Sequence, residues 1–281
     1  MAGINGAVSP PEIEAPLPRG PRWEALEGGT PTVLIIGEFA AILAIWQVAV
    51  GVFELVSPVF LPPPSEIAAG FWNLLVTGEL WNHALSSLAA WFAGFALAAV
   101  GGVAIGNALG TWVPVHRLVG PILWSFYAIP WLAYQPLSQA WFGFGLPPVI
   151  FLVFIASLFP ILFNTAAGVS STDQSLLNAG KVFGATRGAA FRKIVLPAAL
   201  PFVFAGMRQS VVMATTALLV AEMTGPSVGM GALIMFKTNQ FATAEAFAGI
   251  VLAVVWTVAL SELVAWAAKR VAPWQSDARR A

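Results

Sequence analysis

The residues in this sequence that could do chemistry are few, and several of them interrupt apolar stretches. Arg208 lies inside one such stretch, Glu222 lies at its end, and Glu262 lies near the end of another. An ionisable side chain inside an apolar stretch is costly to bury, so it is usually paired or functional. The chain also has two histidines, His83 and His116, and no cysteine. This set is too sparse for a metal or catalytic site, so we expect neither.

The composition sets the class of protein that must position these residues. Of 281 residues, 58% are hydrophobic and 9% are charged, with 13 acidic and 13 basic side chains. An ordinary soluble domain has roughly 25% charged residues, which it needs to cover its surface. The balance of charges leaves no basic face for a nucleic acid, and the lack of cysteine excludes a disulfide scaffold. The composition therefore predicts a multi-spanning membrane protein.

The apolar stretches predict an all-α polytopic fold with six transmembrane helices. A helix needs about 20 mostly apolar residues to cross a bilayer. We expect two spans within 118–172, separated by a re-entrant turn at 142–148. The other four spans are expected at 32–53, 80–116, 198–221 and 246–268.

The basic residues predict the orientation of these spans. Eleven of the 13 Lys and Arg residues fall on the side that would hold both termini, whereas Lys237 alone falls on the other side. Because positive charge collects on the cytoplasmic side, we expect both termini to be cytoplasmic. We divide the chain into a disordered, proline-rich cytoplasmic tail over 1–31, a membrane domain over 32–272 and a short cytoplasmic tail over 273–281.

Small residues recur at every fourth position of the second span. They form one stripe on a helix and would let another helix backbone approach closely. The stripe predicts tight helix packing, without indicating a particular function. Its members are Gly94, Ala98, Gly102, Gly106 and Gly110.

The loop between the fourth and fifth spans, about 170–197, has a pattern of its own. A helical piece leads to Gly184, a second basic helical piece follows, and Pro197 opens the next span. A glycine suits a sharp turn, and proline suits the first turn of a helix. An amphipathic basic helix of this kind can lie on a membrane surface or dock into a groove on a partner.

This loop resembles the "EAA" signature of permease subunits of bacterial ABC importers. That signature is Glu-Ala-Ala, three residues, Gly, nine residues, Ile, any residue, and Leu-Pro. Here Ala179, Gly184, Ile194 and Leu196-Pro197 keep the spacing, while Asn178 and Gly180 replace the first Glu and the second Ala. Several other segments are similar to the nitrate, sulfonate and taurine branch of these permeases: 61–67, 160–161, 164–165, 168–169, 221–223 and 229–231.

The resemblance implies that the loop is a coupling helix held in a groove of a separate ATP-hydrolysing subunit. The chain itself would then be no enzyme and would bind no cofactor, because ATP and Mg would sit on a dimer of that partner. No Gly-x-x-x-x-Gly-Lys-Ser/Thr segment is present in the chain. The residues implied to couple to the ATPase are Asn178, Ala179, Gly180, Gly184, Ala185, Arg187, Ile194, Leu196 and Pro197.

The resemblance also implies a bacterial inner-membrane location, a second permease copy, contact with membrane lipid and a binding protein outside the cytoplasm that delivers a small anionic solute. Two copies would enclose a path lined mainly by the third to fifth spans. The candidate path residues are Tyr134, Gln135, Gln139, Arg208, Gln209, Ser210, Thr215, Thr216 and Glu222.

Alternatives remain open at two levels. Arg208 could attract an anionic solute, or it could reach the cytoplasmic surface or pair with a neighbour. The whole chain could instead be an ion-coupled secondary carrier, which the lack of carboxylates at span centres disfavours. It could also be the coupling component of an energy-coupling-factor vitamin importer. Those components carry Ala-Arg-Gly motifs, which Thr186-Arg187-Gly188 matches only in part.

Overall fold

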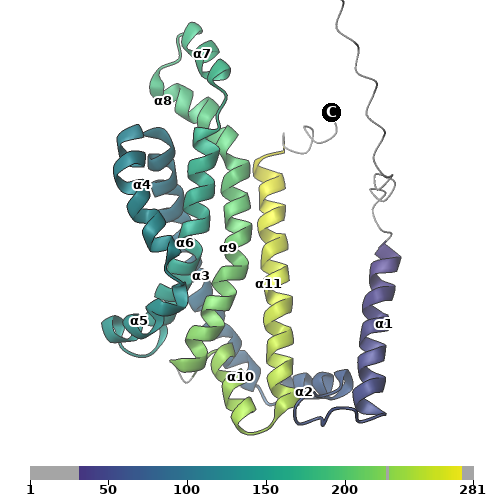
Figure 1. Ribbon diagram of the computed structural model, residues 1–281. Coiled ribbons are helices and arrows are strands. Elements are labelled where there is room, and N and C mark those ends of the chain that lie inside the picture. The colour runs from purple at the N-terminus through teal and green to yellow at the C-terminus, as the bar shows by residue number, and fades with distance from the viewer. Residues whose placement is uncertain (1–31, 226–227, 274–281) are drawn as a thin grey trace, which may run out of the picture. The chain divides into compact units, whose positions relative to one another are not determined.

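The computed structural model describes residues 32–225 and 228–273, in which the regular structure is helical (Figure 1). The predicted tail over 1–31 and nearly all of the tail over 273–281 lie outside these residues. The chain divides into two compact units, 1–46 and 47–281. The boundary falls inside the first helix, α1 (Thr32–Gly51), whose apolar side chains up to Trp46 are mostly exposed.

The second unit contains the remaining helices. A 3₁₀ turn at Trp131–Ala133 precedes α5, and a π-helical segment, Phe191–Val195, joins α8 to α9. The α-helices are α2 (Pro64–Val76), α3 (Glu79–Thr111), α4 (Val113–Ala128), α5 (Tyr134–Phe142), α6 (Leu146–Ser170), α7 (Gln174–Val182), α8 (Arg187–Ala190), α9 (Leu196–Thr224), α10 (Met230–Asn239) and α11 (Thr243–Val271).

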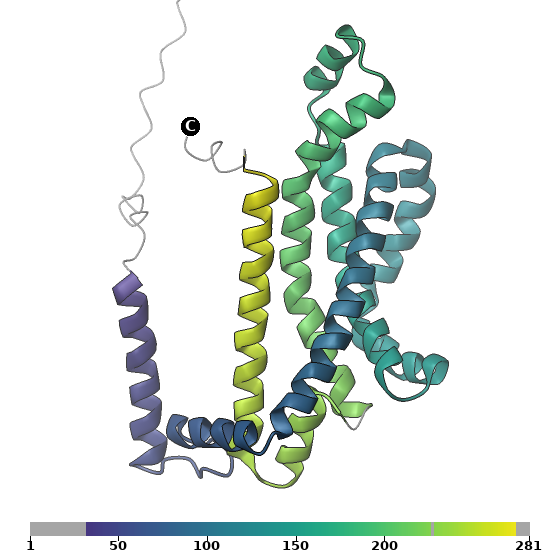
Figure 2. The same cartoon turned by 180° about the vertical axis from the view of Figure 1, so that it is seen from behind.

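Helix α6 forms the centre of this unit, with α3 and α9 packed along it (Figures 1 and 2). The predicted small-residue stripe is the α3 face that meets α6. A Cβ at Gly94 would lie 2.7 Å from the Ile150 carbonyl oxygen, and one at Gly110 would lie 2.8 Å from that of Ala166. Since these distances leave no room for a side chain, the glycines allow the two backbones to approach closely.

Among the described residues, five helices are long and apolar enough to cross a membrane: most of α1, then α3, α6, the continuous helix 187–224 and α11. The structure differs from the prediction at the third span. Helix α4 begins at Val113 and ends at Ala128, so it has 16 residues. Pro130 cannot supply a helical N–H, and the chain turns into α5 there. The six-span count therefore stays a prediction.

Helices α7 and α8 lie at one end of the second unit, and α2 and α10 lie at the other (Figure 1). At the α10 end, Lys237 Nζ donates to Glu79 at 2.8 Å and to Glu245 at 2.7 Å, which ties α3, α10 and α11 together. Burial alone would lower the pKa of Lys237. The hydrogen bonds and charges of Glu245 and Glu79 outweigh burial and raise that pKa above its usual value.

Candidate functional site

The loop between α6 and α9 folds as two helical pieces separated by a glycine turn, as predicted. Asp173 Oδ1 accepts the N–H of Ser175 at 2.8 Å and caps α7. This hydrogen bond lowers the pKa of the Asp173 carboxyl. Gly184 follows α7 with a φ of 76°, a conformation that few residues other than glycine adopt readily. Thr186 then caps α8 by accepting the N–H of Ala189.

The two pieces of the loop contact each other through the predicted motif positions. The N–H of Ala185 donates to the Gly180 carbonyl oxygen at 2.9 Å, which closes the turn. A Cβ on Gly180 would lie 2.9 Å from Cδ1 of Ile194. Gly180 therefore lies against the Ile194 side chain, whose terminal methyl group would have to shift slightly to admit an alanine at this position.

The tip of this loop presents apolar side chains to solvent. Val182 and Phe183 are 84% and 89% exposed, and Leu176 is about half exposed. Lys181 and Arg187 lie beside them and are at least partly exposed. An apolar tip with a cationic rim is the pattern of a helix that docks into a groove. The remaining motif residues are at least partly exposed as well: Asn178, Ala179, Ile194, Leu196 and Pro197.

The candidate path residues separate into two groups. Arg208, Gln209 and Thr216 lie on α9 with their side chains at least partly exposed. Gln209 Oε1 accepts from Nδ2 of Asn164 on α6 at 3.4 Å. Arg208 donates from Nη2 to Glu262 Oε1 at 3.2 Å, so the neighbour-pairing alternative describes its contact in this structure.

The second group is enclosed between helices or half-buried beside them. The Ser210 hydroxyl donates to the Ser157 carbonyl oxygen at 2.8 Å, and the Thr215 hydroxyl accepts from Trp91 Nε1 at 3.2 Å. Three residues around α5 also belong to this second group. Tyr134 is buried in the core, Gln139 donates from Nε2 to the Thr224 carbonyl oxygen, and the Gln135 carbonyl oxygen accepts the Ser138 hydroxyl.

Glu222 belongs to this second group and is the centre of a buried polar cluster. Its side chain is 1% exposed, and Oε2 accepts the N–H of Gly231 at 2.9 Å. The Ser87 hydroxyl donates to the carboxylate at 2.6 Å and accepts the N–H of Met230 at 2.8 Å. His83 Nδ1 lies 3.1 Å from the nitrogen of Gly229. The carboxylate thus sits at the N-terminus of α10, where helix N–H groups favour negative charge.

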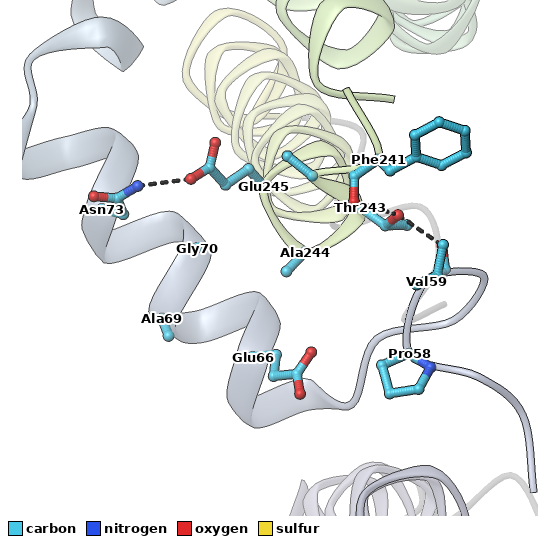
Figure 3. Close-up of a pocket in the computed structure, with 11 residues that line it drawn as sticks. Pro58, Val59, Glu66, Ala69, Gly70, Asn73, Phe241, Thr243, Ala244 and Glu245 are labelled. Atoms are coloured by element: carbon cyan, nitrogen blue, oxygen red, sulfur yellow. Dashed lines mark hydrogen bonds between the residues drawn. The ribbon is translucent and has the colours of Figure 1, made fainter. Parts of the chain in front are cut away.

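A pocket of about 420 Å³ opens where α2 meets the start of α11 (Figure 3). Asn73 donates from Nδ2 to Glu245 Oε1 at 2.6 Å, and the Thr243 hydroxyl donates to the Val59 carbonyl oxygen at 2.7 Å. Glu66 also lines the pocket. Within residues 32–225 and 228–273, no three His, Cys, Asp or Glu side chains gather to hold a metal.

Sequence reasoning misses several of these contacts. Glu262 is visible in the sequence as a carboxylate near a helix end, but nothing there indicates that it faces Arg208. Ser87 carries no motif, and Asn164 falls in a segment noted only for its resemblance to related permeases. The two are 135 and 45 residues from the side chains they bind. Long-range pairs of this kind follow from how the helices pack, which spacing along one chain does not encode.

The chain matches a protein family described as the inner membrane component of binding-protein-dependent transport systems, over residues 98–277. The chain belongs to this family. It is therefore an all-α integral membrane permease, and such permeases work with an ATPase and a substrate-binding protein. The predicted all-α membrane fold and the predicted transport function are confirmed, whereas the six-span count and the coupling helix stay predictions.

Curated relatives cover most of the chain. It is 29% identical to the taurine transport permease of Escherichia coli, over 87% of this chain and 90% of that one. It is 33% identical to a putative aliphatic sulfonates permease of Bacillus subtilis, over 85% and 86%. It is 32% identical to the riboflavin permease of Chloroflexus aurantiacus, over 91% and 92%. Each match therefore extends along most of this chain and most of the relative.

A solved structure supports the fold independently. An amino acid ABC transporter with histidines aligns with a TM-score of 0.58 at 16% identity, covering 71% of this chain and 98% of that one. At this identity the likeness concerns the fold alone.

Proposed function

We propose that this chain forms the translocation path of an ATP-driven importer for a small, anionic solute of the taurine, sulfonate or nitrate type. The relatives named for taurine and sulfonates support this class of solute. ATP and Mg are bound and used by a separate dimeric subunit. A second copy of the permease completes the path, and a binding protein delivers the solute from outside the cytoplasm. Both termini and the α7–α8 loop are cytoplasmic.

The observation that carries the coupling part of this proposal is the α7–α8 loop. It offers an exposed apolar tip, Val182 and Phe183, next to a glycine turn that sets the course of the chain between α7 and α8. Exposed aromatic and aliphatic side chains gathered on a protein surface mark a contact site. In the proposal this tip enters a groove on the ATPase subunit, so closure of the ATPase dimer pushes on α8. That push reaches the membrane through α9, because residues 187–224 form one continuous helix.

The polar side chains of α9 carry the path part of the proposal. Arg208, Gln209 and Thr216 are at least partly exposed on a helix that is otherwise apolar enough to span a membrane. Polar side chains in a membrane normally meet water or another protein helix rather than lipid. The enclosed residues Ser210, Thr215 and Glu222 would hold α9 in place through their hydrogen bonds to neighbouring helices.

A matched pair of substitutions tests the coupling assignment. A Cβ placed at Gly184 or at Gly188 would enter open space, since nothing lies within 4 Å of it at either glycine. Only Gly184 of the two has a positive φ, so only Gly184→Val strains the turn. We expect Gly184→Val to insert in the membrane but to lower both co-purified ATPase subunit and ATP-driven uptake by about tenfold. Gly188→Val should remain close to the parent protein.

Full ATPase binding and full uptake by Gly184→Val would remove the loop from the coupling role. If the parent permease itself purified alone from several detergents, with no ATPase at stoichiometric amounts, the importer assignment would fall with it.

A further inference from the structure

The first turn of α10 is held by side chains of two other helices. The first N–H groups of a helix have no partner within the helix itself. Here three successive N–H groups each meet a side chain of α3 or α9. Measured from the nitrogen to the acceptor atom, the pairs are Gly229 with His83 at 3.1 Å, Met230 with Ser87 at 2.8 Å and Gly231 with Glu222 at 2.9 Å.

Two glycines let the backbone come this close to the Glu222 carboxylate. A Cβ at Gly229 would lie 2.6 Å from Glu222 Oε1, and Gly229 has a φ of 142°, which other residues rarely adopt. A Cβ at Gly231 would overlap the Leu219 carbonyl oxygen on α9. The start of α10 therefore fits against the end of α9 with no side chain of either glycine between them.

Separating α10 from α9 at this point would be costly. The Glu222 side chain is 1% exposed, so a solute in the path does not touch it and bulk water does not reach it. A buried carboxylate that loses its hydrogen bonds is strongly destabilised. We therefore expect α10 to follow α9 when α9 moves.

From α10 the contacts continue to α11 and α2. Lys237, in the last turn of α10, donates to Glu245 on α11 at 2.7 Å. Glu245 Oε1 in turn accepts from Asn73 Nδ2 on α2 at 2.6 Å (Figure 3). Because residues 187–224 form one continuous helix, a chain of contacts runs from α8 through α9 and α10 to α2 at the opposite end.

We propose that Glu222 is a positioning residue that links nucleotide binding by the ATPase subunit to docking of the binding protein at the end formed by α2, α10 and the start of α11. This inference rests on the proposed function and deepens it, because it assigns the residue through which the two partners influence each other. Such coupling is reciprocal. If closure of the ATPase dimer moves α10, a binding protein that prefers one position of α10 favours the matching state of the ATPase.

The affinity for the binding protein in two nucleotide states tests the inference. The assembled importer is placed in nanodiscs, and labelled binding protein is titrated with and without a non-hydrolysable ATP analogue. We expect the ratio of the two dissociation constants to be about 5–150 for the parent complex, the usual range for coupled sites. Glu222→Gln keeps the shape of the side chain but offers one acceptor oxygen in place of two, and its ratio should fall close to unity.

Trp91→Phe is the matched control. Trp91 Nε1 donates to the Thr215 hydroxyl at 3.2 Å, so this variant also removes a buried hydrogen bond between α3 and α9. Since α10 keeps its attachment, the ratio should stay parental. A ratio close to unity in Trp91→Phe as well would show that any loosening of α9 abolishes the coupling, and it would overturn the assignment to Glu222.

A second variant covers the case in which Glu222→Gln does not assemble. His83→Ala removes the contact with Gly229 from a partly buried position, and the ratio should again fall. A parental ratio in assembled Glu222→Gln, or in His83→Ala where Glu222→Gln does not assemble, overturns the inference while the importer function stands. Absence of ATP-driven uptake of any solute by the parent complex would instead count against the proposed function.

A spin label on α10 gives a readout that needs no binding protein. The chain has no cysteine, so Asn239→Cys, exposed at the end of α10, supplies a single thiol for a nitroxide. We expect the ATP analogue to change the line shape of the label in the parent background and to leave it constant with Glu222→Gln. No change in the parent background, or a change of the same size in both, overturns the inference.

Discussion

At the scale of single residues, the Ser87 hydroxyl holds the buried cluster together because it acts in both directions. It donates to Glu222 and accepts from the N–H of Met230, so one side chain on α3 joins α9 to α10. Buried polar groups cost free energy when they lose a partner. Removing this hydroxyl would leave a buried carboxylate and a buried N–H each short of a hydrogen bond.

We therefore expect Ser87→Ala to destabilise the permease by about 2–4 kcal/mol, the cost of two weakened buried contacts. Thermal unfolding in detergent, monitored by tryptophan fluorescence, measures this effect. The midpoint temperature of unfolding should be lower for Ser87→Ala than for the parent. Ser125→Ala serves as the control, because the exposed Ser125 hydroxyl donates within its own helix, to the Pro121 carbonyl oxygen. A midpoint for Ser87→Ala equal to that of the control would contradict this account of the cluster.

At the scale of elements, periodic features are what the sequence can predict. The small-residue stripe on α3, the glycine turn at Gly184 and the proline in the first turn of α9 all follow from local spacing, and the structure contains them. The sequence does not predict helices α2 and α10, because each is short and partly polar and so resembles a loop in composition. The end of α4 escapes it too, since the apolar stretch continues past Pro130 and hides the break there.

The stripe makes a quantitative prediction about packing between α3 and α6. A Cβ on Gly106 would lie 2.5 Å from the Leu162 carbonyl oxygen and 2.7 Å from Cβ of Thr165, neither of which can move easily. We expect Gly106→Ala to lower stability by about 1–3 kcal/mol, the usual cost of overpacking. Gly120→Ala on α4 adds the same methyl group with nothing within 4 Å, and it should be neutral or stabilising because alanine favours a helix. Thermal unfolding of both variants side by side measures this, and equal midpoints would refute it.

At the scale of the whole molecule, the second unit carries different chemistry at its two ends. One end holds the α7–α8 loop with an exposed apolar tip, and the other holds the ion cluster in which Lys237 joins Glu79 and Glu245. The importer proposal needs the first end to meet an ATPase inside the cell and the second to face the binding protein. The distribution of Lys and Arg predicts the same orientation.

Single thiols introduced into the cysteine-free chain test this orientation. Ser175 on α7 and Asn239 at the end of α10 are both exposed. With a membrane-impermeant maleimide and cells whose outer membrane has been opened, Asn239→Cys should be modified at once. Ser175→Cys should be modified only after the inner membrane is permeabilised. The reverse pattern would invert the topology and place the α7–α8 tip out of reach of any cytoplasmic ATPase.

The contact between α3 and α6 has a mechanical consequence. The α3 glycines lie directly against carbonyl oxygens and β-branched side chains of α6, such as Val153 and Val169, which have few rotamers available to absorb sliding. We therefore expect α3 and α6 to move together as one rigid body. A transport cycle opens the path alternately to the two sides of the membrane. We expect the hinge motion of such a cycle at the proline break between α4 and α5 and at the contact between α9 and α11.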